Sequence, residues 1–292
     1  MSDPYGLQHP WYPVSACEMV VTDIDHSEGV AVDANGLIWC GGEEGQVYHC
    51  PAGSVRPEPI AHLPGRTLGV AIDGSGTSYW CDMTGPGVYA VTADGMVKEV
   101  SRGATDAPFL CPNFPAFLPD GHLIVSESGN YGQNDGKLLI ISPDSTTRVL
   151  SATASAFTNG LCVSADGRTL YVVESTLPGI SALTINEDGS VSDYRVLVEL
   201  PGTVPDGLAL DTEGRLYIGC WVPDAILVLA PEGKVETVVY DPERQMLNAT
   251  TNIAFGGPGM RELYFANYGE RHIGRLTLPV TGQPTHQPTW AR

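Results

Sequence analysis

The chain has 292 residues, with 34 acidic against 15 basic side chains and a formal net charge of -19 at pH 7. This charge argues against nucleic acid and against an anionic membrane surface as partners, because both would repel it. No stretch is long and apolar enough to span a bilayer as a helix. The 34 glycines and 23 prolines are typical of a turn-rich protein.

The N-terminal residues 1–15 are rich in proline and predict an irregular arm. They lack the basic start and the apolar run of a secretory signal. The seven cysteines form no C-x-x-C pair, and an odd number without such a signal is typical of reduced thiols. We therefore expect a cytoplasmic protein. The next segment, CEMVVTDI at 17–24, predicts a β-strand.

A short motif then recurs six times: an apolar strand, a turn rich in Gly and Asp, and a second apolar strand. It is clearest in DGLALDTEGRLYIGCW, at 206–221. The copies begin at residues 28, 68, 113, 159, 206 and 252, so the steps are 40, 45, 46, 47 and 46 residues. A period in this range with several short strands per repeat is typical of a β-propeller blade. The sequence predicts an all-β, six-bladed propeller with four-stranded antiparallel blades, forming a single domain over residues 1–292.

In the first blade the four strands are expected near 30–33, 37–41, 46–50 and 58–62. The last repeat has a third strand near 273–278, followed by a tail at 279–292, and so lacks an outer strand. The segment at 17–24 is free to supply that strand. We therefore expect the N-terminal strand to close the ring, which would remove two exposed sheet edges.

The residue that opens each inner strand is expected at the same mouth of the ring as the loop after each second strand. Asp and Asn before Gly are common in turns, but Glu is not, and five oxygen-bearing side chains converge here. Two carboxylates near one axis would repel each other unless a cation lay between them. Oxygen ligands suit Ca²⁺, Mg²⁺ or Mn²⁺, with Zn²⁺ as an alternative. The opening residues are Glu28, Leu68, Asn113, Asn159, Asp206 and Asn252.

The motifs SEGVAVD with Glu28, TNGLCVS with Asn159 and PDGLALD with Asp206 resemble the senescence marker protein/gluconolactonase/luciferin-regenerating enzyme family. The resemblance covers about residues 17–278. It implies that these three side chains bind one divalent metal and that the reaction is hydrolysis of a lactone ring. Asn113 matches a family Asn that touches substrate, or metal through water. The diisopropylfluorophosphatase and paraoxonase propellers are similar too, with a Glu, two Asn and an Asp around a catalytic Ca²⁺.

One position departs from the family pattern. Sugar-lactone members tend to have an Arg two residues before the Asn of the third blade, whereas this chain has Cys111. This difference argues against a simple sugar-acid lactone as substrate. The phenylalanines Phe109, Phe114 and Phe157 are candidates for a more apolar pocket, although aromatic residues are more often part of a core. The predicted substrate pocket comprises Asn113, Cys111, Glu127, Met83, Trp221 and Tyr268.

In the resulting hypothesis, the metal polarises the ester carbonyl and activates a water molecule. Asp206 is the candidate base that guides this water, Asn113 orients the substrate, and His272 is a candidate for proton transfer. The chain has no G-x-S-x-G motif of a serine hydrolase. Two alternatives stay open: a phosphotriesterase or arylesterase with the same site, and a non-catalytic propeller that binds a ligand around a structural metal.

Overall fold

The computed structural model describes residues 7 and 9–290. The predicted arm at 1–15 therefore lies partly outside the described residues, as do the last two residues of the tail. Within the described part the arm includes a short 3₁₀ turn, η1 (Val14–Ala16), and a second one, η2 (Pro258–Met260), follows a strand of the last blade. No helix in this part is long and apolar enough to cross a bilayer.

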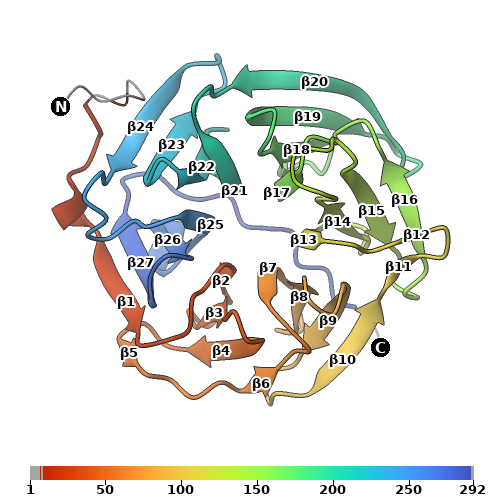
Figure 1. Ribbon diagram of the computed structural model, residues 1–292, viewed down its shortest axis with the longest axis horizontal. Coiled ribbons are helices and arrows are strands. Elements are labelled where there is room, and N and C mark those ends of the chain that lie inside the picture. Colours follow the sequence, from red (N-terminus) through yellow and green to blue (C-terminus); the bar gives the residue numbers. More distant parts are fainter. Residues whose placement is uncertain (1–6, 8, 291–292) are drawn as a thin grey trace.

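The described residues form six large sheets arranged around a central axis, with one additional two-stranded sheet, so the predicted six-bladed propeller is confirmed (Figure 1). We number the blades by the order of their inner strands. Blade 1 contains β2 (Val30–Val32), β3 (Ile38–Gly41), β4 (Gln46–Cys50) and β6 (Ala61–His62). Blade 2 contains β7 (Thr67–Ile72), β8 (Ser78–Asp82), β9 (Gly87–Val91) and β10 (Val97–Ser101). Blade 3 contains β13 (Pro112–Phe117), β14 (Leu123–Glu127), β15 (Lys137–Ile141) and β16 (Thr147–Ser151).

The remaining three blades repeat this antiparallel order, and a small hairpin joins blades 2 and 3. The hairpin is β11 (Gly103–Ala104) with β12 (Ala107–Pro108). Blade 4 contains β17 (Thr158–Val163), β18 (Thr169–Glu174), β19 (Gly179–Ile185) and β20 (Val191–Glu199). Blade 5 contains β21 (Val204–Leu210), β22 (Leu216–Val222), β23 (Ala225–Leu229) and β24 (Val235–Tyr240). Blade 6 contains β25 (Thr250–Gly256), β26 (Glu262–Asn267), β27 (His272–Thr277) and the N-terminal β1 (Glu18–Thr22).

The ring is closed by the N-terminal strand, as the sequence predicts. Strand β1 pairs antiparallel with β27, with Glu18 opposite Arg275 and Thr22 opposite His272. Arg275 also forms an ion pair with Glu18 across the junction, 2.5 Å between Nη2 and Oε2. A two-residue strand, β5 (Ser54–Val55), pairs in parallel with the outer side of β1. Residues from the two ends of the chain therefore make one sheet, and the last blade gains its missing outer strand.

The turn between the first two strands of a blade is encoded locally. The Asp33 carboxylate accepts hydrogen bonds from the backbone N–H of Asn35 and Leu37, 2.8 and 3.0 Å away. Gly36 closes this turn with φ of +79°, a conformation that glycine adopts without steric cost. The same Asp and Gly pattern recurs at Asp73 and Asp211. These turns lie at the end of the ring opposite the predicted mouth.

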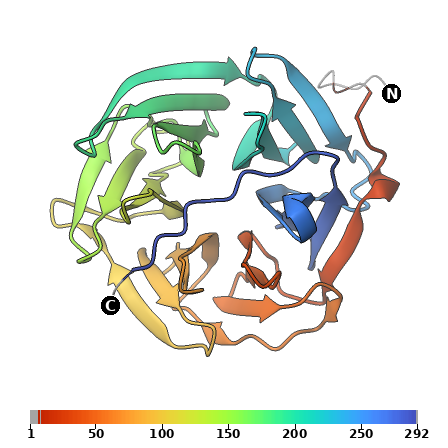
Figure 2. The same ribbon diagram turned by 180° about the vertical axis from the view of Figure 1, so that it is seen from behind.

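The tail after β27 takes a path that the sequence does not predict. Residues 279–290 cross the face of the ring that carries the hairpin turns (Figure 2). Gln283 N–H donates to the Leu210 carbonyl, 2.8 Å away, and Gly74 N–H donates to the Pro288 carbonyl, 3.1 Å away. Trp290 is buried and packs edge-on against Tyr79, with ring centroids 5.1 Å apart. The tail is thus fixed at both ends.

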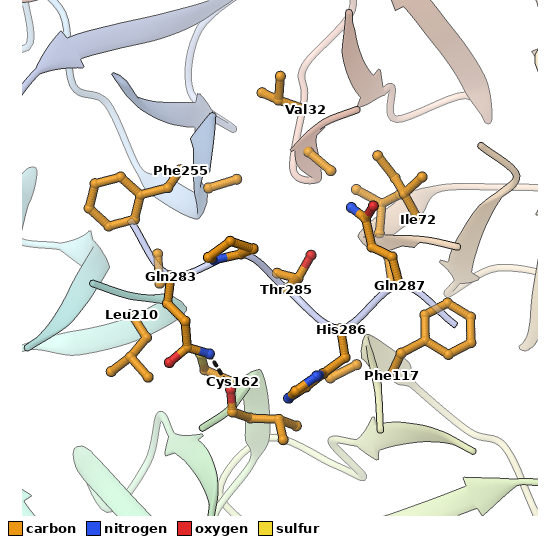
Figure 3. Close-up of a pocket in the computed structure, with 18 of the residues that line it drawn as sticks. Val32, Ile72, Phe117, Cys162, Leu210, Phe255, Gln283, Thr285, His286 and Gln287 are labelled. Atoms are coloured by element: carbon orange, nitrogen blue, oxygen red, sulfur yellow. Dashed lines mark hydrogen bonds between the residues drawn. The ribbon is translucent and has the colours of Figure 1, made fainter. Parts of the chain in front are cut away.

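Beneath the tail lies an apolar cavity of about 240 Å³ on the propeller axis (Figure 3). The inner strands of all six blades line it with side chains such as Val32, Ile72 and Leu210. The side chain of Gln283 turns to one wall, where it donates to the Val163 carbonyl over 3.0 Å. The tail therefore covers this end of the axis, which we call the sealed end, and the predicted mouth lies at the other end.

Candidate metal and substrate site

Glycines after the opening residues bring the inner strands close to the axis. A Cβ atom at Gly160 would lie 2.5 Å from the Asp206 carbonyl oxygen, and one at Gly207 would lie 2.7 Å from the Thr251 carbonyl oxygen. Both glycines lie within strands, β17 and β21. The Asn-Gly and Asp-Gly pairs at these two sites therefore serve close packing between inner strands of neighbouring blades rather than turns.

The mouth contains a pocket of about 400 Å³ whose floor consists of the opening residues. Asn252 lies beside this floor, with its Nδ2 group 2.8 Å from the Glu28 carbonyl oxygen, to which it donates. Apart from Leu68, these side chains carry oxygen atoms, and all are buried. The structure thus brings together the residues predicted to bind metal. The floor residues are Glu28, Leu68, Asn113, Asn159 and Asp206.

A hydrogen-bond relay orients the two floor amides of blades 3 and 4. Asn113 Nδ2 donates to Ser128 Oγ over 3.1 Å, and Ser128 Oγ donates to the Thr158 carbonyl over 2.6 Å. The same relay begins at Asn159, whose Nδ2 donates to Ser175 Oγ over 3.2 Å. Each relay leads to the backbone of the next blade. Because the amide nitrogen is used in this way, the amide oxygen is left for another partner.

Four oxygens of the opening residues are buried and lack any hydrogen-bond partner within the described part of the chain. Unpaired buried polar atoms are rare, and leaving one costs about 1–3 kcal/mol. Each belongs to a different blade. Amide and carboxylate oxygens are the ligands that hard divalent ions prefer, so this donor set fits such an ion. The four atoms are Oδ1 of Asn113, Asn159, Asp206 and Asn252.

The electrostatics of the carboxylates agree with this interpretation. Burial raises the pKa of Asp206 well above its usual value, and the nearby charge of Glu28 raises it further. Burial also raises the pKa of Glu28, while the charge of Arg66 opposes the change. Two buried carboxylates with one guanidinium leave an uncompensated negative charge when both are ionised, and a divalent cation would neutralise it.

Among the described residues, no three His, Cys, Asp or Glu side chains lie close enough together to hold a metal ion by themselves. This result does not conflict with the donor set described above, because three of its members are asparagines. Amide oxygens are ordinary ligands for Ca²⁺.

Arg66 is the charged pocket residue that sequence reasoning missed, and Ser175, Val204 and Val222 also line the pocket without having been predicted there. Its Nη2 atom lies 2.6 Å from Glu28 Oε2, and its guanidinium lies over the Tyr268 ring, 4.0 Å from the centroid. One signal for it was available in the sequence. Arg66 lies two residues before Leu68 in blade 2, just as Cys111 lies two residues before Asn113 in blade 3. Nothing in the sequence shows which way a side chain in this loop points.

Aromatic residues form the walls of the pocket. Tyr131 and Phe157 pack edge-on with centroids 5.0 Å apart, and Trp221 stacks on Tyr268 with centroids 5.1 Å apart. Met83, Phe157 and Trp221 line the cavity as expected, together with Tyr131. Tyr268 was also predicted in the pocket but is not one of its lining residues. Its ring packs against the Arg66 guanidinium, and its hydroxyl donates to Glu43 Oε1 over 2.6 Å. The walls are thus apolar around a charged and polar floor.

Glu127, predicted in the pocket, instead fixes a loop. Its carboxylate is buried and accepts hydrogen bonds from the backbone N–H of Leu110, Cys111 and Gly129, at 3.0, 2.8 and 3.1 Å. These bonds hold the segment that leads into β13 and its Asn113. The sequence signal for this role is a Ser directly after the Glu, a pair that recurs at Glu174. Glu174 likewise accepts a hydrogen bond from the backbone N–H of Ser155.

His272 does not reach the pocket. Its ring is buried on β27, where Nε2 lies 3.1 Å from the Met246 carbonyl oxygen and donates to it. Burial lowers its pKa from the usual 6.5. An imidazole enclosed by its own blade has no path to a substrate at the axis. The predicted role in proton transfer is therefore not supported by its position.

Of the remaining predicted residues, Cys111 lines the pocket, and burial together with the charge of Glu127 raises its pKa to about 12. A thiol with this pKa stays protonated and is a poor nucleophile. Phe109 lies in a core cluster between blades 2 and 3. Phe114 lines the sealed apolar cavity rather than the mouth.

With this geometry in place, comparison with known proteins identifies the family. Residues 61–268 match the model of the SMP-30/Gluconolactonase/LRE-like region. The chain belongs to this family. The resemblance inferred from the three motifs is thereby confirmed, and the match includes the opening residues of blades 2 to 6.

Among curated proteins, this SMP-30/gluconolactonase family member is similar to regucalcins. It is 32% identical to regucalcin of Xenopus laevis over 136 residues, which cover 45% of this chain and 44% of the relative. It is 32% identical to regucalcin of Sus scrofa over 130 residues, covering 42% of each chain. The matched stretch thus spans less than half the length of these relatives.

Solved structures show the same fold at lower sequence identity. A gluconolactonase from Xanthomonas campestris is 19% identical, with a TM-score of 0.76 over 90% of this chain and 89% of that chain. A regucalcin from Agrobacterium tumefaciens, described as a calcium-binding protein, is 20% identical, with a TM-score of 0.76 over 96% and 99% of the two chains. At these identities the likeness establishes the propeller fold alone.

Proposed function

We propose that this chain is a divalent-metal-dependent hydrolase that opens lactone rings. The observation that carries the proposal is the set of unpaired, buried oxygens around the axis, contributed by Asn113, Asn159, Asp206 and Asn252 next to the Glu28 carboxylate. Membership of a family that includes gluconolactonases makes a lactone the first substrate class to test.

Glu28, Asn159 and Asp206 are the residues that would hold the ion. When bound, it would supply positive charge beside the ester carbonyl oxygen and lower the pKa of a water molecule. Asp206 would accept the proton of the attacking water, because its carboxylate is buried at the pocket floor and general bases act over hydrogen-bond distances. Asn113, held by Ser128, would orient the substrate.

The aromatic walls would exclude bulk water from the ring being opened. Tyr131, Phe157 and Trp221 surround the floor with apolar surface, and a less polar surrounding strengthens the interactions of the charged groups with the substrate. The Cys111 thiol, protonated because of its raised pKa, favours activated water over a covalent nucleophile.

A second candidate is hydrolysis of a phosphotriester or an aryl ester. Asn113 favours it, because its relay and its unpaired oxygen are the same as those of Asn159. Asn113 would then be a fourth ligand rather than a substrate-orienting group. Rates on a panel of lactones, phosphotriesters and aryl esters distinguish the two reactions.

The test uses protein stripped with a chelator and reloaded separately with Ca²⁺, Mn²⁺, Mg²⁺ or Zn²⁺. We expect lactone hydrolysis to vanish on stripping and to return with one of these ions. Glu28→Gln should abolish turnover and keep the fold, whereas the exposed control Glu58→Gln should behave as wild type. Turnover that survives complete stripping would overturn the proposal. A metal that binds and stabilises the protein without any hydrolysis would instead indicate a ligand-binding propeller with a structural metal.

A further inference from the structure

Arg66 is the only cationic side chain among the described residues that line the mouth pocket. Its side chain is 23% exposed, and that of its partner Glu28 is 8% exposed. In a chain with 34 acidic and 15 basic residues, a cation placed in the pocket beside the predicted metal site requires an explanation. Stabilisation of the ring is an insufficient one, because replacing a buried ion pair by apolar groups is often neutral or stabilising.

The guanidinium of Arg66 is only partly used. Nη2 bonds to Glu28 Oε2 over 2.6 Å, while the adjacent Nε–H is buried and has no acceptor in the described part of the chain. Nε and Nη2 form one edge of the guanidinium, and this edge can hold both oxygens of a carboxylate or a phosphate in parallel. Glu28 therefore occupies half of an edge that is suited to two bonds.

Glu28 is also one of the residues that would hold the metal. An ion that takes this carboxylate competes with Arg66 for it, since both are positive and one carboxylate cannot fully satisfy both. The guanidinium is then left in the pocket with Nε and Nη2 unpaired. Burial alone would lower the pKa of Arg66, but attraction to Glu28 raises it, and the group is charged throughout.

Blade 2 differs from the other blades in a way that fits this arrangement. Its opening residue, Leu68, brings no oxygen to the axis, and Arg66 lies two residues before it. The Tyr268 ring supports the guanidinium from the other side, with 4.0 Å from Cζ to the ring centroid. A negatively charged substituent of a ligand on the blade 2 side of the pocket would meet the Arg66 guanidinium. The opening residue of blade 2 contributes no carboxylate there to repel it.

We propose that Arg66 forms an anion-binding subsite, released from Glu28 when the metal binds, and that the substrate is a lactone carrying a carboxylate or phosphate group. This inference rests on the proposed lactonase function. It assigns the anionic substituent to the blade 2 side of the pocket and the ester to the oxygen side. It also makes metal binding and anion binding mutually favourable. The metal would free Arg66 from Glu28, and the anion would free Glu28 from Arg66.

The kinetic test compares two γ-butyrolactones substituted on the ring carbon next to the ring oxygen, one with a carboxylate and one with the uncharged carboxamide. Arg66→Gln should raise KM for the carboxylate about tenfold or more, in the range expected for losing a charge-assisted bidentate contact, and leave the carboxamide nearly unchanged. Arg66→Lys should restore part of the difference. The exposed arginine variant Arg56→Gln, which removes the same charge far from the pocket, is the matched control.

A second measurement does not depend on turnover. Calorimetric titration of stripped protein with Ca²⁺ alone should show tighter binding to Arg66→Gln than to wild type, by about tenfold, since a neighbouring positive charge that holds Glu28 has been removed. Chemical unfolding of both proteins checks that the variant is folded.

The outcomes separate the two proposals. Equal losses on both lactones would place Arg66 at the reacting ester and overturn the subsite, while the lactonase proposal stands. Equal or weaker Ca²⁺ binding by Arg66→Gln would overturn the competition for Glu28. If neither lactone is hydrolysed, calorimetry with the lactone carboxylate as ligand still decides: binding that needs both Ca²⁺ and Arg66 supports the subsite, and binding independent of Arg66 overturns it.

Discussion

The mouth and the sealed end of the propeller axis are built from the same inner strands but have opposite chemistry. At the mouth, each blade except blade 2 places an oxygen-bearing side chain near the axis, and four of these oxygens have no hydrogen-bond partner among the residues that the structure describes. At the sealed end, the same strands continue as Val, Ala, Ile and Leu around an apolar cavity, which the tail covers. Buried polar atoms left unpaired reduce stability, whereas the apolar packing and the fixed tail increase it.

This contrast indicates a division of roles along one set of strands. Proteins accept destabilised groups where a ligand or a reaction needs them and compensate elsewhere. Substitutions at the mouth should therefore affect turnover more than stability, and substitutions at the sealed end should do the reverse. Two experiments test this difference, and a third examines a buried group that lies away from both ends; they follow from the largest expected effect to the smallest.

Asp206→Asn tests the mouth. We expect kcat/KM on a lactone to fall about a thousandfold, equivalent to about 4 kcal/mol, because the variant loses a charged metal ligand and the proposed base. The free energy of unfolding of the metal-free protein should stay the same or rise, since a buried carboxylate repelled by Glu28 is removed. Steady-state kinetics and urea unfolding in chelator measure both quantities. The exposed turn variant Asp166→Asn is the control, and a large loss of stability in Asp206→Asn would contradict the division of roles.

Trp290→Ala tests the sealed end. The indole is 5% exposed, packs against Tyr79 and Phe117, and donates to the Gly121 carbonyl. Its removal should lower the free energy of unfolding by about 3 kcal/mol, near the lower end for a buried tryptophan, because the chain end can relax. The kcat/KM should not change. Urea unfolding compared with the neighbouring exposed variant Thr289→Ala measures the effect. Loss of activity in a still-folded Trp290→Ala protein would show that the two ends are coupled.

His272→Gln tests a buried titratable group away from both ends. Burial lowers the pKa of His272 in the folded protein from the usual 6.5, although Met246 and Glu270 oppose the change. The unfolded chain therefore binds a proton at higher pH than the folded one. Above about pH 6.5 the imidazole is neutral in both states, so its full contribution to the free energy of unfolding is present. This contribution is lost as the pH falls toward the lowered pKa, by no more than about 1.4 kcal/mol per pH unit.

The measurement compares the free energies of unfolding of wild type and His272→Gln between pH 7 and about pH 5. The variant should lose this part of the pH dependence, whereas the exposed control His62→Gln should keep it. An identical pH dependence in all three proteins would show that His272 titrates alike in the folded and unfolded states. A change in the pH profile of kcat for His272→Gln would instead restore the catalytic role first predicted for it.

Most of the fold could be predicted because its determinants are local and repeated. The Asp and Gly of each hairpin turn, seen at Asp33 and Gly36, specify the turn through their own hydrogen bonds and backbone conformation. The repeat spacing then specifies the number of blades. The absence of an outer strand after 273–278 correctly indicated closure by the N-terminal segment.

The candidate site could be predicted only in part. The opening positions come together because every blade places the start of its inner strand at the axis, so one alignment of repeats locates all of them. The functions of side chains in the loops between blades do not follow from such an alignment. Arg66 turns into the pocket, Glu127 turns back to three backbone N–H groups, and His272 is enclosed in its own blade. These directions depend on contacts with segments distant in sequence.

The sequence alone determined the periodic features of this protein: the blade, its repetition, and the ring of oxygens at residues that open the inner strands. They follow from backbone hydrogen bonds and side-chain alternation over a few residues, which the chain carries in every repeat. Only the tertiary structure decided the ion pair of Arg66 with Glu28, 38 residues apart, and the path of the tail from blade 6 to Trp290. Both arise from contacts made once, between parts of the chain that no repeat relates.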